Sequence, residues 1–160
     1  MKSIFKQIKW PKLIASIILC QLAGVIGAIF TTPAIGSWYN LLNKPSFAPP
    51  GWLIGIIWII LYTLMGISLY IIWNKYKPKY KLALSLFGLQ LFLNTLWSIL
   101  FFGLRSPVLG FIWILDLWLA ILATKVAFYK ISKNAAYLLL PYLIWVTIAA
   151  ILNYYILILN

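Results

Sequence analysis

The sequence is first notable for what it lacks: it has no histidine, a single cysteine and a single acidic residue. Histidine is the commonest metal ligand and the commonest acid–base residue, so its absence removes both. One acid cannot make the carboxylate pair of a glycosidase-type site. Cys20 has no second cysteine with which to form an intrachain disulfide. We therefore predict no metal site, and no zinc, di-iron or Ser-His-Asp site can be assembled.

Charge is also scarce. Charged residues make up 9% of the chain, whereas 65% of its residues are apolar and the mean hydropathy is +1.02. A water-soluble domain needs far more charge on its surface. The apolar residues occur in runs of about 20, the length of helix that crosses the ~30 Å hydrocarbon core of a bilayer. The sequence therefore predicts an integral membrane protein built of helices.

Five such runs divide the chain. We predict an all-α bundle of five transmembrane helices that forms one domain over residues 1–160, with spans at about 13–31, 52–73, 82–102, 108–129 and 135–159. Pro141, early in the fifth run, is expected to start or kink that helix. The lysines before the first run resemble the start of a signal peptide. Because the run is long for a signal peptide and no clear small-x-small cleavage site follows it, we expect an uncleaved first span.

The basic residues are unevenly placed along this topology. Eleven of the 13 lie at the N-terminus and in the second and fourth connections, with Lys125 counted at a helix end. Lys44 and Arg105 belong to the other side. The positive-inside rule then predicts a cytoplasmic N-terminus and an outside C-terminus, in an asymmetry that suits a bacterial or archaeal cell membrane. The basic residues form no stripe, so we expect no nucleic-acid partner.

The stretch 38–52, WYNLLNKPSFAPPGW, separates the first two runs and differs from both. Pro45, Pro49 and Pro50 prevent a single helix from crossing it, because proline lacks an N–H and disfavours helical geometry in the residue before it. Its aromatic ends favour the water–lipid boundary. We predict that this structured loop is a lid over the mouth of the bundle.

Three of the predicted helices carry polar and aromatic residues at spacings that share one face. The residues are Trp58 and Tyr62; Gln90, Asn94, Trp97 and Ser98; and Tyr142, Trp145, Ala149 and Asn153. Asn, Gln and Ser commonly join helices in membranes, so these residues can serve helix packing alone. Alternatively they line one flat pocket under the lid, which would suit a large planar apolar ligand with a few polar edges.

Two further features leave alternatives open. Asp116, the only acid, lies near the middle of the fourth span, where an ionisable group usually faces the bundle interior. It either serves a ligand or a proton, or is protonated and hydrogen-bonded to a neighbouring helix. In the first span, Ala23, Gly24, Gly27 and Ala28 form small-xxx-small pairs. Such pairs let helices approach closely, either within the bundle or in a dimer.

Four segments follow one another along nearly the whole chain: WYNLLNKPSFAPPGW, WLIGIIWIILYTLMG, LNTLWSILFFGLRSP and PYLIWVTIAAILNYY. Together they resemble the TspO/translocator protein family, also called tryptophan-rich sensory proteins. The resemblance implies five transmembrane helices, a homodimer, and a pocket under the first loop that binds porphyrins such as protoporphyrin IX. It implies no required cofactor beyond this tetrapyrrole ligand.

Carried over to this sequence, the resemblance places seven residues in the pocket and its roof: Trp38, Pro45, Trp58, Asn94, Trp97, Trp145 and Asn153. Tyr62, Asp116, Tyr142 and Ala149 complete the set of expected ligand-binding residues. Lys44 or Arg105 is expected to meet the carboxylates of the ligand.

The resemblance leaves the activity open. The first hypothesis is a membrane receptor or transport-type protein for porphyrins, and the alternative is a light- and oxygen-dependent porphyrin-degrading enzyme that uses pocket tryptophans. Some members also bind cholesterol through a fifth-helix pattern with a basic residue after the tyrosine. Here Tyr154 and Tyr155 are followed by ILILN, so that route is in doubt.

Overall fold

The computed structural model describes residues 8–75 and 77–160, and within these it is all-helical. Five helical stretches are long and apolar enough to cross a membrane: Trp10–Tyr39, Gly51–Asn74, Pro78–Gly103, Pro107–Tyr129 and Lys133–Leu159. The predicted all-α bundle of five transmembrane helices is therefore confirmed.

Several of these stretches contain more than one helical element. The first is α2 (Trp10–Ala34) with a π-helical turn η1 (Ile35–Tyr39), and the second is α3 (Gly51–Asn74). The third contains η2 (Pro78–Tyr80), α4 (Lys81–Ser98) and a second π-helical turn, η3 (Ile99–Gly103). The fourth is α5 (Pro107–Tyr129), and the fifth is α6 (Lys133–Leu138) followed by α7 (Leu140–Leu159).

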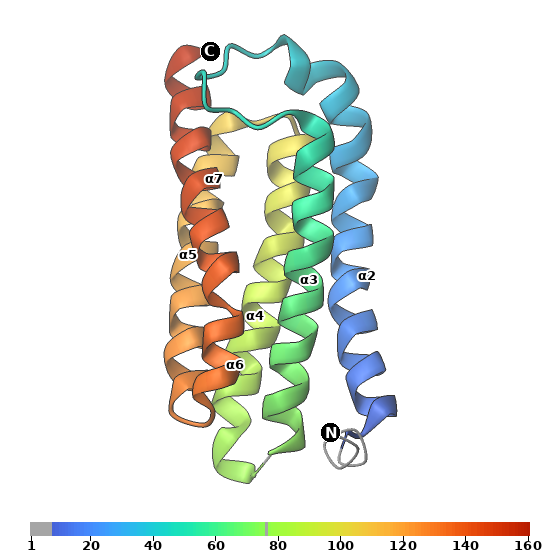
Figure 1. Cartoon of the computed structure of the whole chain (residues 1–160). Helices are drawn as coiled ribbons and strands as arrows, with labels where there is room; N and C mark the ends of the chain where they lie inside the picture. The colour runs from blue at the N-terminus through green and yellow to red at the C-terminus, as the bar shows by residue number, and fades with distance from the viewer. Residues whose placement is uncertain (1–7, 76) are drawn as a thin grey trace.

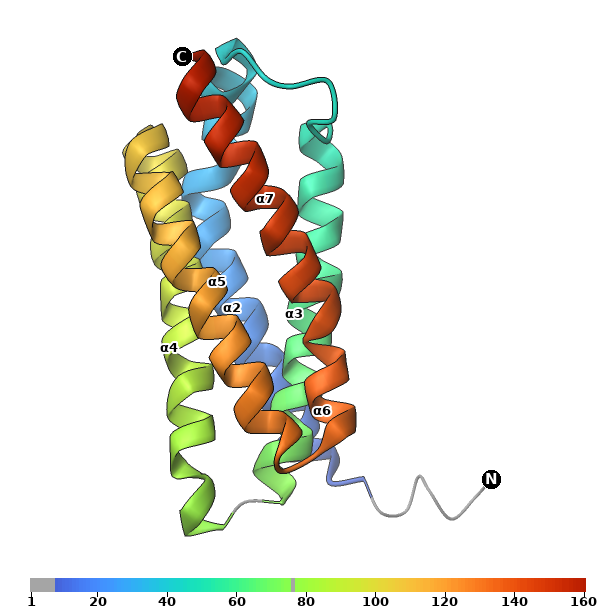
Figure 2. The ribbon, with the colours of Figure 1, turned by 90° about the vertical axis from the view of Figure 1, so that its left-hand side faces the viewer.

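The helices run side by side as an elongated bundle. Figure 1 shows α2 beside α3 on one side and α7 beside α5 on the other, with α4 behind. The turned view in Figure 2 shows the first loop reaching from the end of α2, past the C-terminal end of α7, to the start of α3. The loop thus crosses one end of the bundle, while the α3–α4 and α5–α6 connections lie at the other end.

Prolines lie at the start of α2, η2, α5 and α7, where their missing N–H is tolerated. Pro107 lies in the first turn of α5, where the Ser106 Oγ accepts a hydrogen bond from the backbone N–H of Leu109 at 3.3 Å. Pro141 lies in the first turn of α7, after a break at Leu139 that separates it from α6. The expectation that Pro141 starts or kinks the fifth helix is confirmed.

The first span is longer, and the loop shorter, than the sequence predicts. Helical structure continues through Trp38 to Leu41, and α3 begins at Gly51, so only 42–50 is non-helical. Pro33 lies inside α2, and the π-helical turn η1 follows immediately. One proline removes a single helical hydrogen bond, and the remaining bonds of a 25-residue helix let it continue past Pro33.

The 42–50 loop is fastened to the last residue of the described chain. The backbone N–H of Asn43 donates to Asn160 Oδ1 at 2.9 Å, and Asn160 Nδ2 donates back to the Asn43 carbonyl at 3.0 Å. Further along the loop, the Phe47 ring packs edge-on against Tyr155 of α7, with ring centroids 5.6 Å apart. These contacts hold the loop across the mouth of the bundle.

Small residues set the spacing of α2 from its neighbours. A Cβ added at Gly24 would lie 2.5 Å from the Tyr62 ring, and one at Gly27 would lie 3.0 Å from Ser98 Oγ. At Gly66 of α3 an added Cβ would lie 2.6 Å from the backbone Cα of Ile17. Of the two alternatives for the small residues of the first span, packing within the bundle therefore accounts for Gly24 and Gly27.

Replacing Gly66 tests this close approach. We expect Gly66→Ala to lower the stability of the bundle by about 1–3 kcal/mol, because backbone atoms of α2 must move to admit the methyl group. Gly88→Ala is the matched control, since nothing lies within 4 Å of its added Cβ. The control should be neutral or stabilise by up to about 1 kcal/mol through helix propensity. Thermal unfolding in detergent compares the two, and equal midpoints would contradict the packing described.

Candidate ligand-binding site

A small apolar cavity lies directly beneath the 42–50 loop. Its volume is about 30 Å³, roughly enough for one water molecule. Indole rings from three helices surround it, namely Trp58 of α3, Trp97 of α4 and Trp145 of α7. The other lining residues are Tyr39, Pro49, Ile54, Phe101, Phe102, Ile148, Ala149, Leu152 and Ile156.

The rings around this cavity form a continuous stack. Trp97 lies parallel to Phe101, with an interplanar angle of 7° and centroids 5.5 Å apart. Trp58 stacks on Tyr62 at 5.4 Å and lies 6.5 Å from Trp97. Offset and edge-on contacts of this kind each add about 0.5–1.5 kcal/mol beyond the area that they bury. The stack joins α3 to α4 and presents flat apolar faces to the cavity.

A second, larger cavity of about 500 Å³ lies on the other side of these rings, between α2 and α3. It shares Ile54, Trp58, Trp97 and Phe102 with the first cavity, so these side chains form a partition between the two. Glycines and alanines form part of its wall, among them Gly55 and Ala28, which are exposed on the outer surface. The larger cavity therefore opens between α2 and α3.

Below the rings, Tyr62, Asn94 and Tyr142 satisfy one another, whereas the buried amide of Gln90, one turn further from the loop, has no hydrogen-bond partner among the described residues. The Tyr62 hydroxyl donates to Asn94 Oδ1, and Asn94 Nδ2 donates to the Tyr142 hydroxyl at 2.8 Å. One turn toward the loop, Trp97 Nε1 lies 3.4 Å from Asn153 Oδ1, which accepts its hydrogen bond. Buried polar groups are costly unless paired, so these bonds position the rings as well as joining α3, α4 and α7.

Two polar atoms at the small cavity remain unpaired. The Tyr39 hydroxyl and Trp145 Nε1 are buried and have no hydrogen-bond partner within residues 8–75 and 77–160. Both residues line the cavity. An unpaired buried donor is unfavourable by about 1–3 kcal/mol, so a polar atom placed in this cavity would be stabilised by them.

The sequence as a whole matches one protein family. The TspO/MBR family profile covers residues 16–159, nearly the whole chain. This protein belongs to the TspO/MBR family.

Three relatives show the extent of the similarity. The chain is 45% identical over 149 residues to tryptophan-rich protein TspO of Archaeoglobus fulgidus, covering 93% of this chain and 97% of that protein. It is also 39% identical over 140 residues to protein CrtK of Rhodobacter capsulatus, covering 86% and 85%, respectively. It is 36% identical over 148 residues to translocator protein of Bos taurus, covering 91% and 88%.

In this TspO/MBR family member, most of the expected site residues lie together at the loop end of the bundle. Trp58, Trp97, Trp145 and Ala149 line the small cavity, and Tyr62 lines the larger one. Asn94, Tyr142 and Asn153 lie behind the rings, in the hydrogen bonds described above. Trp38 packs edge-on against Phe101, with centroids 5.4 Å apart. Pro45 belongs to a turn in the loop, where its carbonyl accepts from Ala48 N–H at 3.0 Å, and the loop proline at the cavity is Pro49.

Asp116 is the clear exception. The expectation that it faces the bundle interior is wrong, because it lies on the exposed outer face of α5. The buried stripe of α5 includes Ile114, Leu117 and Ile121, which places Asp116 on the face that also carries Ile112 and Leu119. α5 is apolar all round, so its sequence does not show which face packs inward.

Two phenylalanines at the site were not among the expected residues. Phe101 follows Trp97 by four positions, so the helical spacing already placed it on the same face. Phe102 is next to it, yet both rings are buried and both line the small cavity. They lie in the π-helical turn η3, which turns the chain less per residue than an α-helix does. This local geometry brings two consecutive rings to one cavity.

The hydrogen bonds through Asn94 lead to a stability prediction. Asn94→Leu leaves the Tyr62 and Tyr142 hydroxyls buried without their shared partner, and we expect a loss of about 1 kcal/mol. The triple variant Tyr62→Phe, Asn94→Leu, Tyr142→Phe removes all three polar groups and should recover most of that loss. Thermal unfolding of wild type, Asn94→Leu and the triple variant measures both effects, and a triple variant less stable than Asn94→Leu would contradict the account.

Proposed function

We propose that this protein is a membrane receptor or transport-type protein that binds a tetrapyrrole such as protoporphyrin IX in the aromatic space beneath the 42–50 loop. The observation that carries the proposal is the convergence of Trp58, Trp97 and Trp145 from three helices on one loop-covered cavity. Flat ring faces on several sides suit a planar apolar macrocycle better than a flexible chain. Membership of the TspO/MBR family supports the same reading.

The ligand needs more room than the cavity under the loop provides. At about 30 Å³ that cavity is far below the ~300–1,000 Å³ of small-molecule sites, whereas the neighbouring cavity of about 500 Å³ falls within that range. The two are separated only by the shared partition of Ile54, Trp58, Trp97 and Phe102. We infer that the macrocycle occupies the larger cavity and displaces Trp58 or Trp97 to reach beneath the loop.

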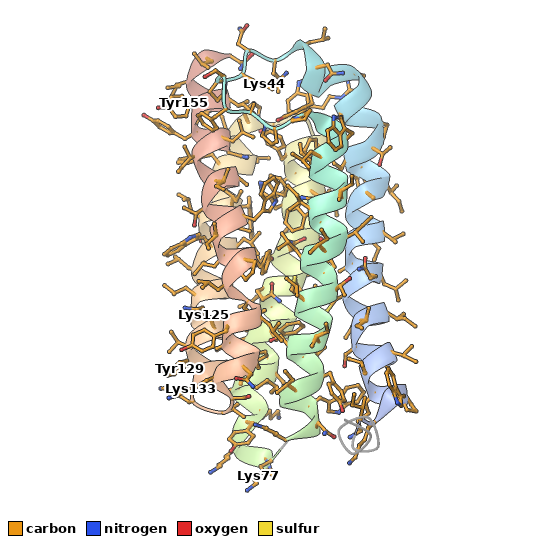
Figure 3. All side chains as sticks on the ribbon, in the orientation of Figure 1. Lys44, Lys77, Lys125, Tyr129, Lys133 and Tyr155 are labelled. Atoms are coloured by element: carbon orange, nitrogen blue, oxygen red, sulfur yellow. The ribbon has the colours of Figure 1, made fainter. Side chains whose placement is uncertain are left out.

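Polar groups at the loop end would orient the ligand. Trp145 Nε1 and the Tyr39 hydroxyl are unpaired hydrogen-bonding groups of residues that line the small cavity beneath the loop. Lys44 lies at the loop, with its Nζ 4.8 Å from the centroid of the Tyr39 ring (Figure 3). Its ammonium donates to the Tyr39 carbonyl at 2.6 Å and the Leu42 carbonyl at 3.0 Å. Its third and longest bond is to the Asn40 carbonyl at 3.4 Å, and a carboxylate of the ligand would replace that carbonyl with a charge-assisted acceptor.

The distribution of charge supports an orientation for the proposed receptor. Lys77 and Lys133 lie near one end of the bundle, with Lys125 in the same half, and Lys44 lies at the other end (Figure 3). The positive-inside rule then places the lysine-rich end in the cytoplasm. In this orientation the loop, the C-terminus and the mouth of the site face outward. A homodimer, as the family resemblance implies, is part of the same proposal.

Titration with protoporphyrin IX tests the pocket. Binding is followed by quenching of tryptophan fluorescence, with Trp58→Phe and Trp145→Phe compared with wild type. We expect each variant to bind about 2–10-fold more weakly, since an aromatic contact is worth about 0.5–1.5 kcal/mol. Trp118→Phe is the control, because Trp118 bonds to Thr147 at 2.8 Å on the outer surface, away from both cavities. Unchanged affinity in both pocket variants would overturn the proposed site.

A second variant pair tests whether the larger cavity takes part. Ala28→Phe puts a ring into the wall of that cavity, and we expect saturable porphyrin binding to be lost. Ile29→Phe, at the next position, places the same ring on the exposed face of α2, where Ile29 is 64% exposed, and should bind as wild type does. Equal affinities for the two variants would show that the ligand does not use the larger cavity.

A further inference from the structure

A groove separate from the aromatic site lies at the lysine-rich end of the bundle. It has a volume of about 360 Å³ and is lined by Trp73 of α3 and by Lys81, Leu84 and Ser85 of α4. Lys12 of α2 lies over the Trp73 ring, with its Nζ 5.3 Å from the ring centroid. Trp73 is therefore in contact with the Lys12 ammonium and also lines the groove that contains Lys81 and Ser85.

These two ammonium groups cannot be neutralised by the chain itself. The chain contains 13 basic residues and one acid, and that acid, Asp116, lies in the middle of α5 rather than near a helix end. Further lysines, Lys75, Lys77 and Lys79, lie in the α3–α4 connection close to Lys81 in the sequence and add to the positive field. The anion that balances this cluster must come from outside the protein.

The groove is amphipathic along the axis of the bundle. Trp73 is the last residue but one of α3 and Lys81 is the first of α4, which is the level of the lipid headgroups. Leu84 lies one turn deeper along α4, and Gly88 follows it on the same face. Gly88 is exposed and has open space around the position of a Cβ. The face of α4 from Leu84 to Gly88, called the apolar track below, therefore has room for an acyl chain.

We propose that this groove binds an anionic phospholipid, with its headgroup phosphate between Lys12, Lys81 and Ser85 and an acyl chain along Leu84 and Gly88. The ammonium groups and the Ser85 hydroxyl all donate hydrogen bonds, which suits the two free oxygens of a phosphodiester. Basic pockets between transmembrane helices on the cytoplasmic side recognise acidic headgroups in this way. The site is independent of the proposed tetrapyrrole pocket, which lies at the opposite end of the bundle.

Native mass spectrometry of the full chain in detergent tests the proposal by counting retained lipids. The probes are phosphatidylglycerol, phosphatidylcholine and inorganic phosphate at equal concentration. We expect one phosphatidylglycerol to be retained preferentially and phosphatidylcholine to be lost. Equal retention of both lipids would overturn the proposal, as would occupation by inorganic phosphate that displaces the lipid, because the site would then recognise a free anion.

Two double variants distinguish binding at this groove from attraction by the overall positive charge. The double variant Lys12→Gln, Lys81→Gln should bind phosphatidylglycerol about thirty-fold more weakly than wild type, since each lysine at a membrane surface contributes about a factor of five. Lys130→Gln with Lys133→Gln removes the same charge from the α5–α6 connection and should bind as wild type does. An equal loss in both pairs would overturn the proposal.

A variant that changes no charge tests the proposal even if the double lysine variant folds poorly. Gly88→Leu fills the apolar track while leaving every lysine in place, and Gly88 has room for a side chain. We expect retention of phosphatidylglycerol to fall while the thermal unfolding midpoint without added lipid stays unchanged. Wild-type retention in Gly88→Leu would show that no acyl chain follows this track and would overturn the assignment.

Discussion

No water is available in the hydrocarbon core of a bilayer, so a chain that crosses it must pair its polar groups internally, and this constraint shapes every part of the bundle. The backbone meets it with five long helices, and the non-helical 42–50 segment lies at the end of the bundle. Buried side chains meet the same constraint through the hydrogen bonds from Tyr62 to Asn94 and from Asn94 to Tyr142. These polar contacts join α3, α4 and α7 at one level and so fix where the rings above them stand.

The aromatic space near the loop is held less firmly than the polar contacts beneath it. Ring contacts there are individually weak, and two polar atoms, the Tyr39 hydroxyl and Trp145 Nε1, are unpaired within the described residues. The loop itself is tied down by its amide contacts with Asn160 and by the bonds from Lys44 to backbone carbonyls. For the proposed function, a tied-down loop over a partition of packed rings would let a flat ligand enter from the α2–α3 side while the loop excludes water.

The scarcity of acid has consequences at two places in the molecule. With Asp116 on the outer face of α5, no acidic side chain is available to the lysines at the helix ends. Asp116 itself is exposed on that outer face, which is an unusual place for an ionisable group in a membrane-spanning helix. The charges of this protein therefore act on its surroundings more than on its own fold.

Much of this architecture follows from the sequence, because run length and spacing have direct physical meaning in a bilayer. The number of spans, the proline-rich loop and the shared faces of Trp58 with Tyr62 and of Asn94 with Trp97 were all predictable. The sequence did not show which face of α5 packs against the bundle, because apolar residues suit both lipid and core. It therefore did not show on which face Asp116 lies. The inward turn of Phe102 depends on local π-helical geometry, which spacing rules do not contain. The continuation of α2 through Pro33 was not predicted either, because a proline is usually a sign of a helix end.

The amino-acid sequence by itself thus determined that the chain crosses the membrane in five helices and carries its polar and aromatic residues on matching faces, because helix length and period follow from composition. Only the tertiary structure decided that the site is divided into two unequal cavities by Trp58 and Trp97. The reason is that a cavity is what remains after side chains from several helices have packed, and no single helix contains that information.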